Sequence, residues 1–128
     1  MNDYFARVVE AGFDDALVRV VEALKGEGFG VLTEIDVSGT LKEKLGVDFR
    51  KYRVLGACNP GLAHQALKAE SKIGMMLPCN VVVQETDGGK TEVAAIDPRA
   101  AMEWVGNPAL AEIADQVAQK LRRVVETV

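Results

Sequence analysis

The segment VVVQETDGGKTEVAAI, residues 81–96, decides the fold class that this chain is expected to adopt. Two runs of alternating side chains, 81–85 and 91–96, flank Asp87-Gly88-Gly89, which is a typical turn sequence. The pattern predicts a β-hairpin, whose strands must be antiparallel. A parallel doubly wound sheet is disfavoured for this reason. Neither a GxGxxG nor a GxxxxGK[ST] phosphate-binding loop is present in the sequence either.

Hydrophobic periodicity predicts further elements on both sides of the hairpin. Apolar residues recur at helical spacing after Asp14, and Asn59-Pro60 combines a preferred N-cap residue with a proline at the first helical position. Thr40 and Glu43 form a capping-box pattern. Strands are expected at 4–9, 29–37 and 52–58, helices at 14–26, 41–45, 60–71 and from Asn107-Pro108 to the C-terminus, and extended chain at 73–78.

These elements predict an α+β fold in a single domain, residues 1–128. The expected order is β-α-β-β-β-β-α with short helical insertions, which gives a mainly antiparallel sheet packed on one face by two main helices. A chain of 128 residues suits one buried core. Trp104 is expected in a connection that packs on the last helix.

Charge and hydropathy disfavour several classes of function. The formal net charge is −4, and basic residues are interspersed with acidic ones, so nucleic-acid binding is not expected. No apolar run approaches the roughly 20 residues that cross a bilayer, and the N-terminal residues carry charges. We therefore expect a cytoplasmic protein that does not interact with membranes.

Both cysteines and the single histidine lie between residues 58 and 79. If the strands on either side of the 60–71 helix are antiparallel, Cys58 and Cys79 come to the same end of the sheet, near the start of that helix. His64 is expected to point away from them. Cys58 would then be a candidate thiolate, because a helix N-terminus lowers the pKa of a nearby thiol, and Cys79 would be its partner. The ordinary alternative is that both cysteines fill the core.

Two other chemistries fit the same region. Cys58, His64 and Cys79 are a weak candidate set for zinc or copper(I), one ligand short of a closed zinc site; we expect no metal or cofactor. Alternatively, a small molecule or anion binds at the corner, where backbone amides at the helix N-terminus and two asparagines are available. The expected ligand-binding residues are Cys58, Asn59, Gly61, Cys79 and Asn80.

Several segments resemble a known family. The stretch from LTEIDVSGT to LGACNP, followed by LAHQAL, IGMMLPCNVVV and VAAIDP, is similar to the bacterial and archaeal domain of unknown function numbered 302. The resemblance covers nearly the whole chain. It implies a fold like that of the TATA-binding protein and a homodimer, and it supplies no catalytic residues.

Two functions therefore remain open from the sequence. The first is a small homodimeric domain that binds a small molecule or anion at the corner formed by Cys58, Asn59, Cys79 and Asn80. The alternative is a thiol-dependent redox or transfer enzyme that uses Cys58 and Cys79. Two free thiols of ordinary pKa would favour the binding domain, whereas a single low-pKa thiol or a readily reversible Cys58–Cys79 disulfide would favour the enzyme.

Overall fold

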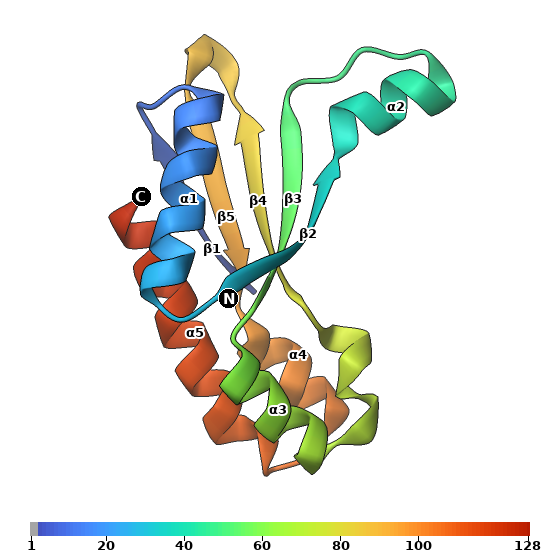
Figure 1. Cartoon of the computed structure of the whole chain (residues 1–128), viewed down its shortest axis with the longest axis vertical. Coiled ribbons are helices and arrows are strands. Elements are labelled where there is room, and N and C mark those ends of the chain that lie inside the picture. Colours follow the sequence, from blue (N-terminus) through green and yellow to red (C-terminus); the bar gives the residue numbers. More distant parts are fainter. Residues whose placement is uncertain (1–2) are drawn as a thin grey trace.

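A computed structural model describes residues 3–128; Met1 and Asn2 lie outside the described residues. Its centre is one antiparallel sheet of five strands in the spatial order β1-β5-β4-β3-β2 (Figure 1). The strands are β1 (Tyr4–Val9), β2 (Gly30–Asp36), β3 (Tyr52–Cys58), β4 (Cys79–Glu85) and β5 (Thr91–Ile96). The predicted α+β class and the order of strands and main helices are confirmed.

The β4–β5 hairpin forms as its sequence predicts. Val83 lies opposite Val93, and the turn between the strands is a short 3₁₀ segment, η2 (Asp87–Gly89). Gly88 and Gly89 have φ angles of 82° and 78°. That left-handed region strains residues with a Cβ atom, so the glycine pair accounts for the tight connection.

Helices cover one face of the sheet. The helical elements are α1 (Phe13–Gly26), α2 (Val37–Leu45), α3 (Pro60–Ala69), η1 (Ser71–Met76), α4 (Pro98–Val105) and α5 (Leu110–Thr127). In Figure 1, α1 and α5 lie across the strands, whereas α3, α4 and η1 gather beyond one end of the sheet. The residues that meet between helices and strands are almost fully buried: Leu55, Val81, Val83, Val93, Val20, Leu24, Leu121 and Val124.

The opposite face of the sheet is not covered by any helix in the described chain. We call it the open face and define it by the strand residues that alternate with the buried ones: Tyr4, Ala6, Val8, Thr33, Ile35, Tyr52, Val54, Gly56, Asn80, Val82, Gln84, Glu92, Ala94 and Ile96. Glu92 is the single charged side chain among these positions. Tyr4, Val8 and Ile35 are each at least half exposed. An antiparallel sheet with one solvated face normally carries polar residues there, so this face is unusually apolar.

Two sequence predictions near β2 are wrong in detail. The strand ends at Asp36, because the Asp36 carboxylate accepts the amide of Gly39 (3.0 Å) and starts α2 four residues before the expected cap at Thr40. A β-bulge between Val31 and Thr33 also breaks the expected alternation. Val31 therefore lies opposite buried Ala57, whereas Thr33 and Ile35 belong to the open face.

Three further predictions need correction toward the C-terminal half. Residues 71–76 form the 3₁₀ helix η1 instead of extended chain, although they still return the chain to β4. Trp104 lies on a helix, α4, and is 88% exposed instead of packing on the last helix. The last helix begins at Leu110, since Asn107 accepts the amide of Ala109 (3.0 Å) and donates to the carbonyl of Ala69 (2.9 Å).

The likeness to the TATA-binding-protein fold stays a prediction.

Across residues 3–128, none of the helices has both the length and the apolar character needed to cross a bilayer.

Candidate functional site

The cysteine corner forms where β3 ends and β4 begins. Cys79 lies opposite Ala57, the residue before Cys58, so both cysteines are at the same end of neighbouring antiparallel strands. Cys58 comes one position after Ala57, so it is not directly opposite Cys79 in the β3–β4 register. The structure thus brings the two residues together at one sheet end, next to the start of α3, without aligning them as a cross-strand disulfide pair.

Both cysteines border a narrow apolar crevice. Its walls come from α3, α4, α5 and the ends of the strands, and its volume is about 20 Å³, which suffices for one water molecule. Cys79 is 6% exposed. Burial, with a smaller contribution from the nearby Cys58, raises the pKa of Cys79 to about 11. Cys79 is consequently a protonated thiol at neutral pH and is not a nucleophile in that state.

The side chain of Asn59 caps the N-terminus of α3. Its Oδ1 accepts the amide of Leu62 (3.2 Å) and its backbone carbonyl accepts the amide of Ala63 (2.9 Å), as expected for an N-cap. Pro60 has no N–H to offer. Within the described chain, Gly61 therefore holds the one first-turn amide of α3 without an acceptor, which leaves little at this helix end for an anion.

The remaining predicted residues do not join the corner. Asn80 lies opposite Gly56 on the open face, whereas its neighbour Cys79 points into the core. His64 is on an exposed position of α3. Among residues 3–128, no three His, Cys, Asp or Glu side chains cluster in a way that would hold a metal ion.

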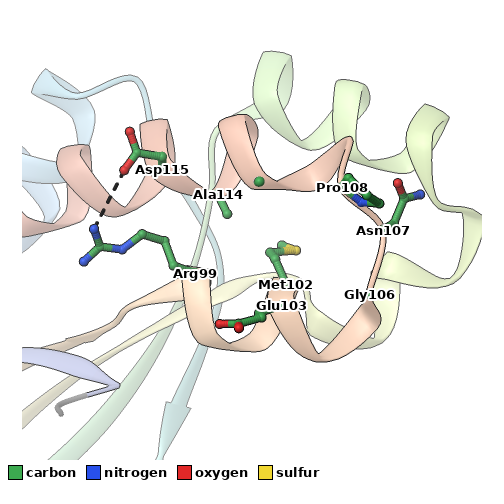
Figure 2. A pocket seen from close by; sticks show the side chains of 9 residues that line it. Arg99, Met102, Glu103, Gly106, Asn107, Pro108, Ala114 and Asp115 are labelled. Atoms are coloured by element: carbon green, nitrogen blue, oxygen red, sulfur yellow. Dashed lines mark ion pairs between the residues drawn. The ribbon is translucent and has the colours of Figure 1, made fainter.

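A larger groove lies between α4 and α5. Its volume is about 480 Å³, within the range of ligand pockets. Figure 2 shows Met102 between the two helices, Arg99 and Asp115 at one end, and Asn107 and Pro108 at the other. Its lining is Arg99, Met102, Glu103, Gly106, Asn107, Pro108, Ala111, Ala114 and Asp115.

The charges at the groove are mostly negative. Arg99 binds the Asp97 carboxylate through Nε (3.0 Å) and Nη2 (2.7 Å), and its Nη1 lies 3.7 Å from Asp115. The Arg99 hydrogen bonds hold the pKa of the Asp97 carboxyl below its usual value. Since Asp97 already neutralises Arg99, the carboxylates of Glu103 and Asp115 leave this end of the molecule negative.

Met102 connects the groove with the cysteine corner. It is 6% exposed and lines both the groove and the crevice that Cys58 and Cys79 border. Along α5, Ile113 and Val117 face the crevice while Ala111 and Ala114 face the groove. A ligand in the groove would therefore be separated from the cysteine crevice by one flexible thioether side chain.

Sequence reasoning missed the groove because it missed α4. The signal was present: Asp97-Pro98 repeats the cap-plus-proline pattern of Asn59-Pro60, and Gly106 ends the helix with a φ of 76°. The Asp97 carboxylate does accept the amide of Arg99 (3.1 Å). The pairing of α4 with α5 could not be read from that local signal, because it depends on how the two helices pack.

The fold and the groove define a small α+β domain with an open antiparallel sheet. A family model, described as domain of unknown function DUF302, matches residues 5–128, and the chain belongs to this family. A crystal structure of an uncharacterized conserved DUF302 protein from Bacillus stearothermophilus is similar, with a TM-score of 0.92 and 32% identity over 99% of this chain and 98% of that chain. No curated protein matches the chain.

Proposed function

We propose that this chain is a homodimeric domain that binds a small molecule in the α4–α5 groove. The observation that carries the proposal is the groove itself, a cavity of about 480 Å³ with an apolar floor and carboxylates at its rim. The adjoining crevice at the cysteines, with a volume of about 20 Å³, is too small for an organic molecule. We therefore propose the ligand site beside the predicted corner, with Met102 lining both cavities.

The ligand class follows from the lining. Met102, Pro108, Ala111 and Ala114 offer apolar contact, which favours a compact hydrophobic body. The guanidinium of Arg99 faces three carboxylates around the groove, those of Asp97, Glu103 and Asp115, and this excess of negative charge favours a positively charged group over an anion. We propose an organic amine or quaternary ammonium compound with an apolar ring or short chain.

A titration with matched probes tests this site. Amide shifts in a ¹⁵N-labelled sample would be followed on adding benzylamine, which carries a cation at neutral pH, and benzoate as the anionic counterpart. We expect benzylamine to shift resonances within 99–115, and benzoate to shift them at least several-fold less. Shifts centred on the open face, or equal responses to both probes, would contradict the proposal.

Two variants sharpen the titration. Glu103→Gln removes one rim charge and is expected to weaken benzylamine binding about threefold to tenfold, since an exposed charge contributes roughly 1 kcal/mol. Glu112→Gln changes a glutamate in the first turn of α5 that does not line the groove, and it should bind as the unmodified chain does.

A thiol-dependent redox or transfer activity is the second candidate function. It is favoured by the crevice that Cys58 and Cys79 share, and by the greater exposure of Cys58 relative to buried Cys79. If this activity exists, Cys58 must carry it. Iodoacetamide should then alkylate Cys58 in the Cys79→Ser variant much faster than an unstructured peptide thiol at pH 7, whereas an ordinary or slower rate would remove the candidate.

A further inference from the structure

The segment after β2 carries apolar side chains that its own chain leaves largely exposed. We call residues 37–51, which comprise α2 and the loop to β3, the arm. No residue of α2 is buried, and Leu45, Val47 and Phe49 are 69%, 43% and 41% exposed. Figure 1 shows α2 beyond the end of β2, away from the helices that cover the other face of the sheet.

The helix of the arm is too short to be stable by itself. Isolated helices below about 12 residues are marginal in water, and α2 has nine. Val37, Leu41 and Leu45 recur every four residues, so they form a single apolar stripe along it. Such a stripe is typical of a helix that packs against another surface.

The open face offers a surface of the same character. It contains a shallow hollow of about 470 Å³, bordered by Tyr4, Tyr52, Val82 and Ala94 among others. The two charged groups at its edge, Arg50 and Glu92, are linked through Gln84. Arg50 Nε donates to Gln84 Oε1 (2.8 Å), and Gln84 Nε2 donates to Glu92 Oε1 (2.9 Å). The face is therefore nearly neutral, hollow and apolar, which suits an apolar helix.

We propose that a second copy of this chain covers the open face and that the arm of each copy packs on the open face of the other. This inference rests on the proposed homodimer and specifies its surfaces. Each copy supplies both surfaces, so one two-fold axis satisfies both contacts at once, as in other isologous dimers.

The area that a dimer needs supports the use of the arm. Four strand spacings make the sheet about 19 Å wide, and its strands are about 20 Å long, so the face offers roughly 400 Å². A stable interface takes about 800 Å² from each partner. The arm connects β2 to β3 at one end of this face and carries the exposed apolar side chains that would supply the rest.

Sedimentation equilibrium on three variants tests the proposal. Leu45→Asp places a charge on the arm, and Val8→Asp places one on the open face. Val18→Asp is the matched control, because the exposure of Val18 (64%) is close to that of Leu45 (69%) but Val18 lies on α1. We expect the unmodified chain to be dimeric at about 50 μM, a concentration that populates dimers with a Kd near 1 μM. Leu45→Asp and Val8→Asp should each raise the Kd at least tenfold, and Val18→Asp should leave it unchanged.

The possible results separate the two claims. A monomeric unmodified chain would overturn both the homodimer and this inference. A dimer that Val8→Asp weakens and Leu45→Asp does not would keep the homodimer and overturn the role of the arm. Equal weakening by Leu45→Asp and Val18→Asp, or no weakening by either interface variant, would also overturn it.

A second measurement does not depend on variants. In a dimer mixed from labelled and unlabelled chains, isotope-filtered spectra should show contacts between the methyl groups of Leu41 or Leu45 and those of Val82 or Ala94. Contacts of these arm methyls confined to their own chain would contradict the proposal.

Discussion

Arg99 binds the carboxylate of Asp97 through two nitrogens while the same carboxylate accepts the backbone amide of Arg99. One buried carboxylate thus begins α4 and also neutralises the guanidinium at the groove. The side chain of Asp97 is 9% exposed, whereas that of Arg99 is half exposed. This arrangement decides both where α4 starts and which charge the groove presents.

Substitutions at Asp97 should separate its two roles. Asp97→Ala removes the cap and is expected to lower the free energy of unfolding by about 1–2 kcal/mol, as loss of an N-cap usually does. Asp97→Asn keeps an oxygen that can cap the helix and removes only the charge, so its loss should be smaller. Urea unfolding at pH 7 measures both. Equal losses would mean that the cap contributes nothing.

The ion pair of Asp97 also predicts a pH dependence. Arg99 lowers the pKa of Asp97 in the folded chain, so between the folded and unfolded values the unfolded chain binds more protons. Its contribution is present above about pH 4 and is lost as the pH falls below that value. The stability difference between the unmodified chain and Asp97→Asn should be constant from pH 7 to 5 and shrink below pH 4. A difference unchanged down to pH 2.5 would contradict this.

Cys79 predicts the opposite pH trend at the alkaline end. Burial raises its pKa to about 11, so the folded chain binds the thiol proton more tightly than the unfolded chain does. Stability from this group is full below about pH 8.5 and is lost as the pH rises toward 11, by about 2–3 kcal/mol for a shift of roughly two units. Unfolding of the unmodified chain and of Cys79→Ala should be compared between pH 7 and 11. The difference in the free energy of unfolding between the two chains should shrink as the pH rises. A constant difference would show that the Cys79 thiol has the same pKa in the folded and unfolded chain.

Gly56 should tolerate no side chain. A Cβ atom there would lie 2.7 Å from Cγ of Pro78 and would collide with the side chain of Thr33. We expect Gly56→Ala to lower the free energy of unfolding by roughly 1–3 kcal/mol, as overpacking does. Gly30→Ala is the control, because Gly30 has open space around its Cβ position in the same sheet. A change at Gly30 as large as that at Gly56 would contradict the steric explanation.

Gly28 and Asn59 should behave as a coupled pair. Gly28 has a φ of 84°, and a Cβ atom there would lie 3.0 Å from Nδ2 of Asn59, the residue that caps α3. Gly28→Ala and Asn59→Ala are each expected to cost about 1 kcal/mol, the first because a Cβ atom is strained at positive φ and the second because a helix cap is lost. The double variant should cost less than the sum, because Asn59→Ala relieves the contact. Strict additivity in urea unfolding would show that the two positions are independent.

The chain should not bind duplex DNA through charge. Its net charge is −4, and part of its basic surface is paired: Arg53 with Glu34, Lys42 with Asp48, and Arg123 with Glu27. We expect no mobility shift of duplex DNA at about 0.15 M salt. Salt-sensitive retention, lost in Arg50→Ala or Lys51→Ala, would contradict this and point to the arm.

Local sequence signals predicted much of the fold. The hairpin follows from alternation around Asp87-Gly88-Gly89, since turn geometry and strand period are properties of a few consecutive residues. The start of α3 follows from Asn59-Pro60 for the same reason, because a cap is satisfied within four residues. The order of the remaining strands and main helices was likewise predicted, and the predicted proximity of Cys58 and Cys79 followed once the strands were taken as antiparallel.

Tertiary packing determined which side chains face the core and where cavities form, and local sequence signals do not contain this information. The bulge after Val31 moves Thr33 and Ile35 to the open face, because the register with β3 sets which side chains face the core. The pairing of β4 with β3 places Asn80 opposite Gly56 on that face, while Cys79 stays in the core. The groove exists because Met102 on α4 and Ala114 on α5 meet across a turn, and the cysteine crevice stays small because α3 and α5 fill it. Hydrophobic burial is a sum over distant segments, so the sequence alone determined which elements form, whereas only their packing determined which surfaces stay open for a ligand or a second chain.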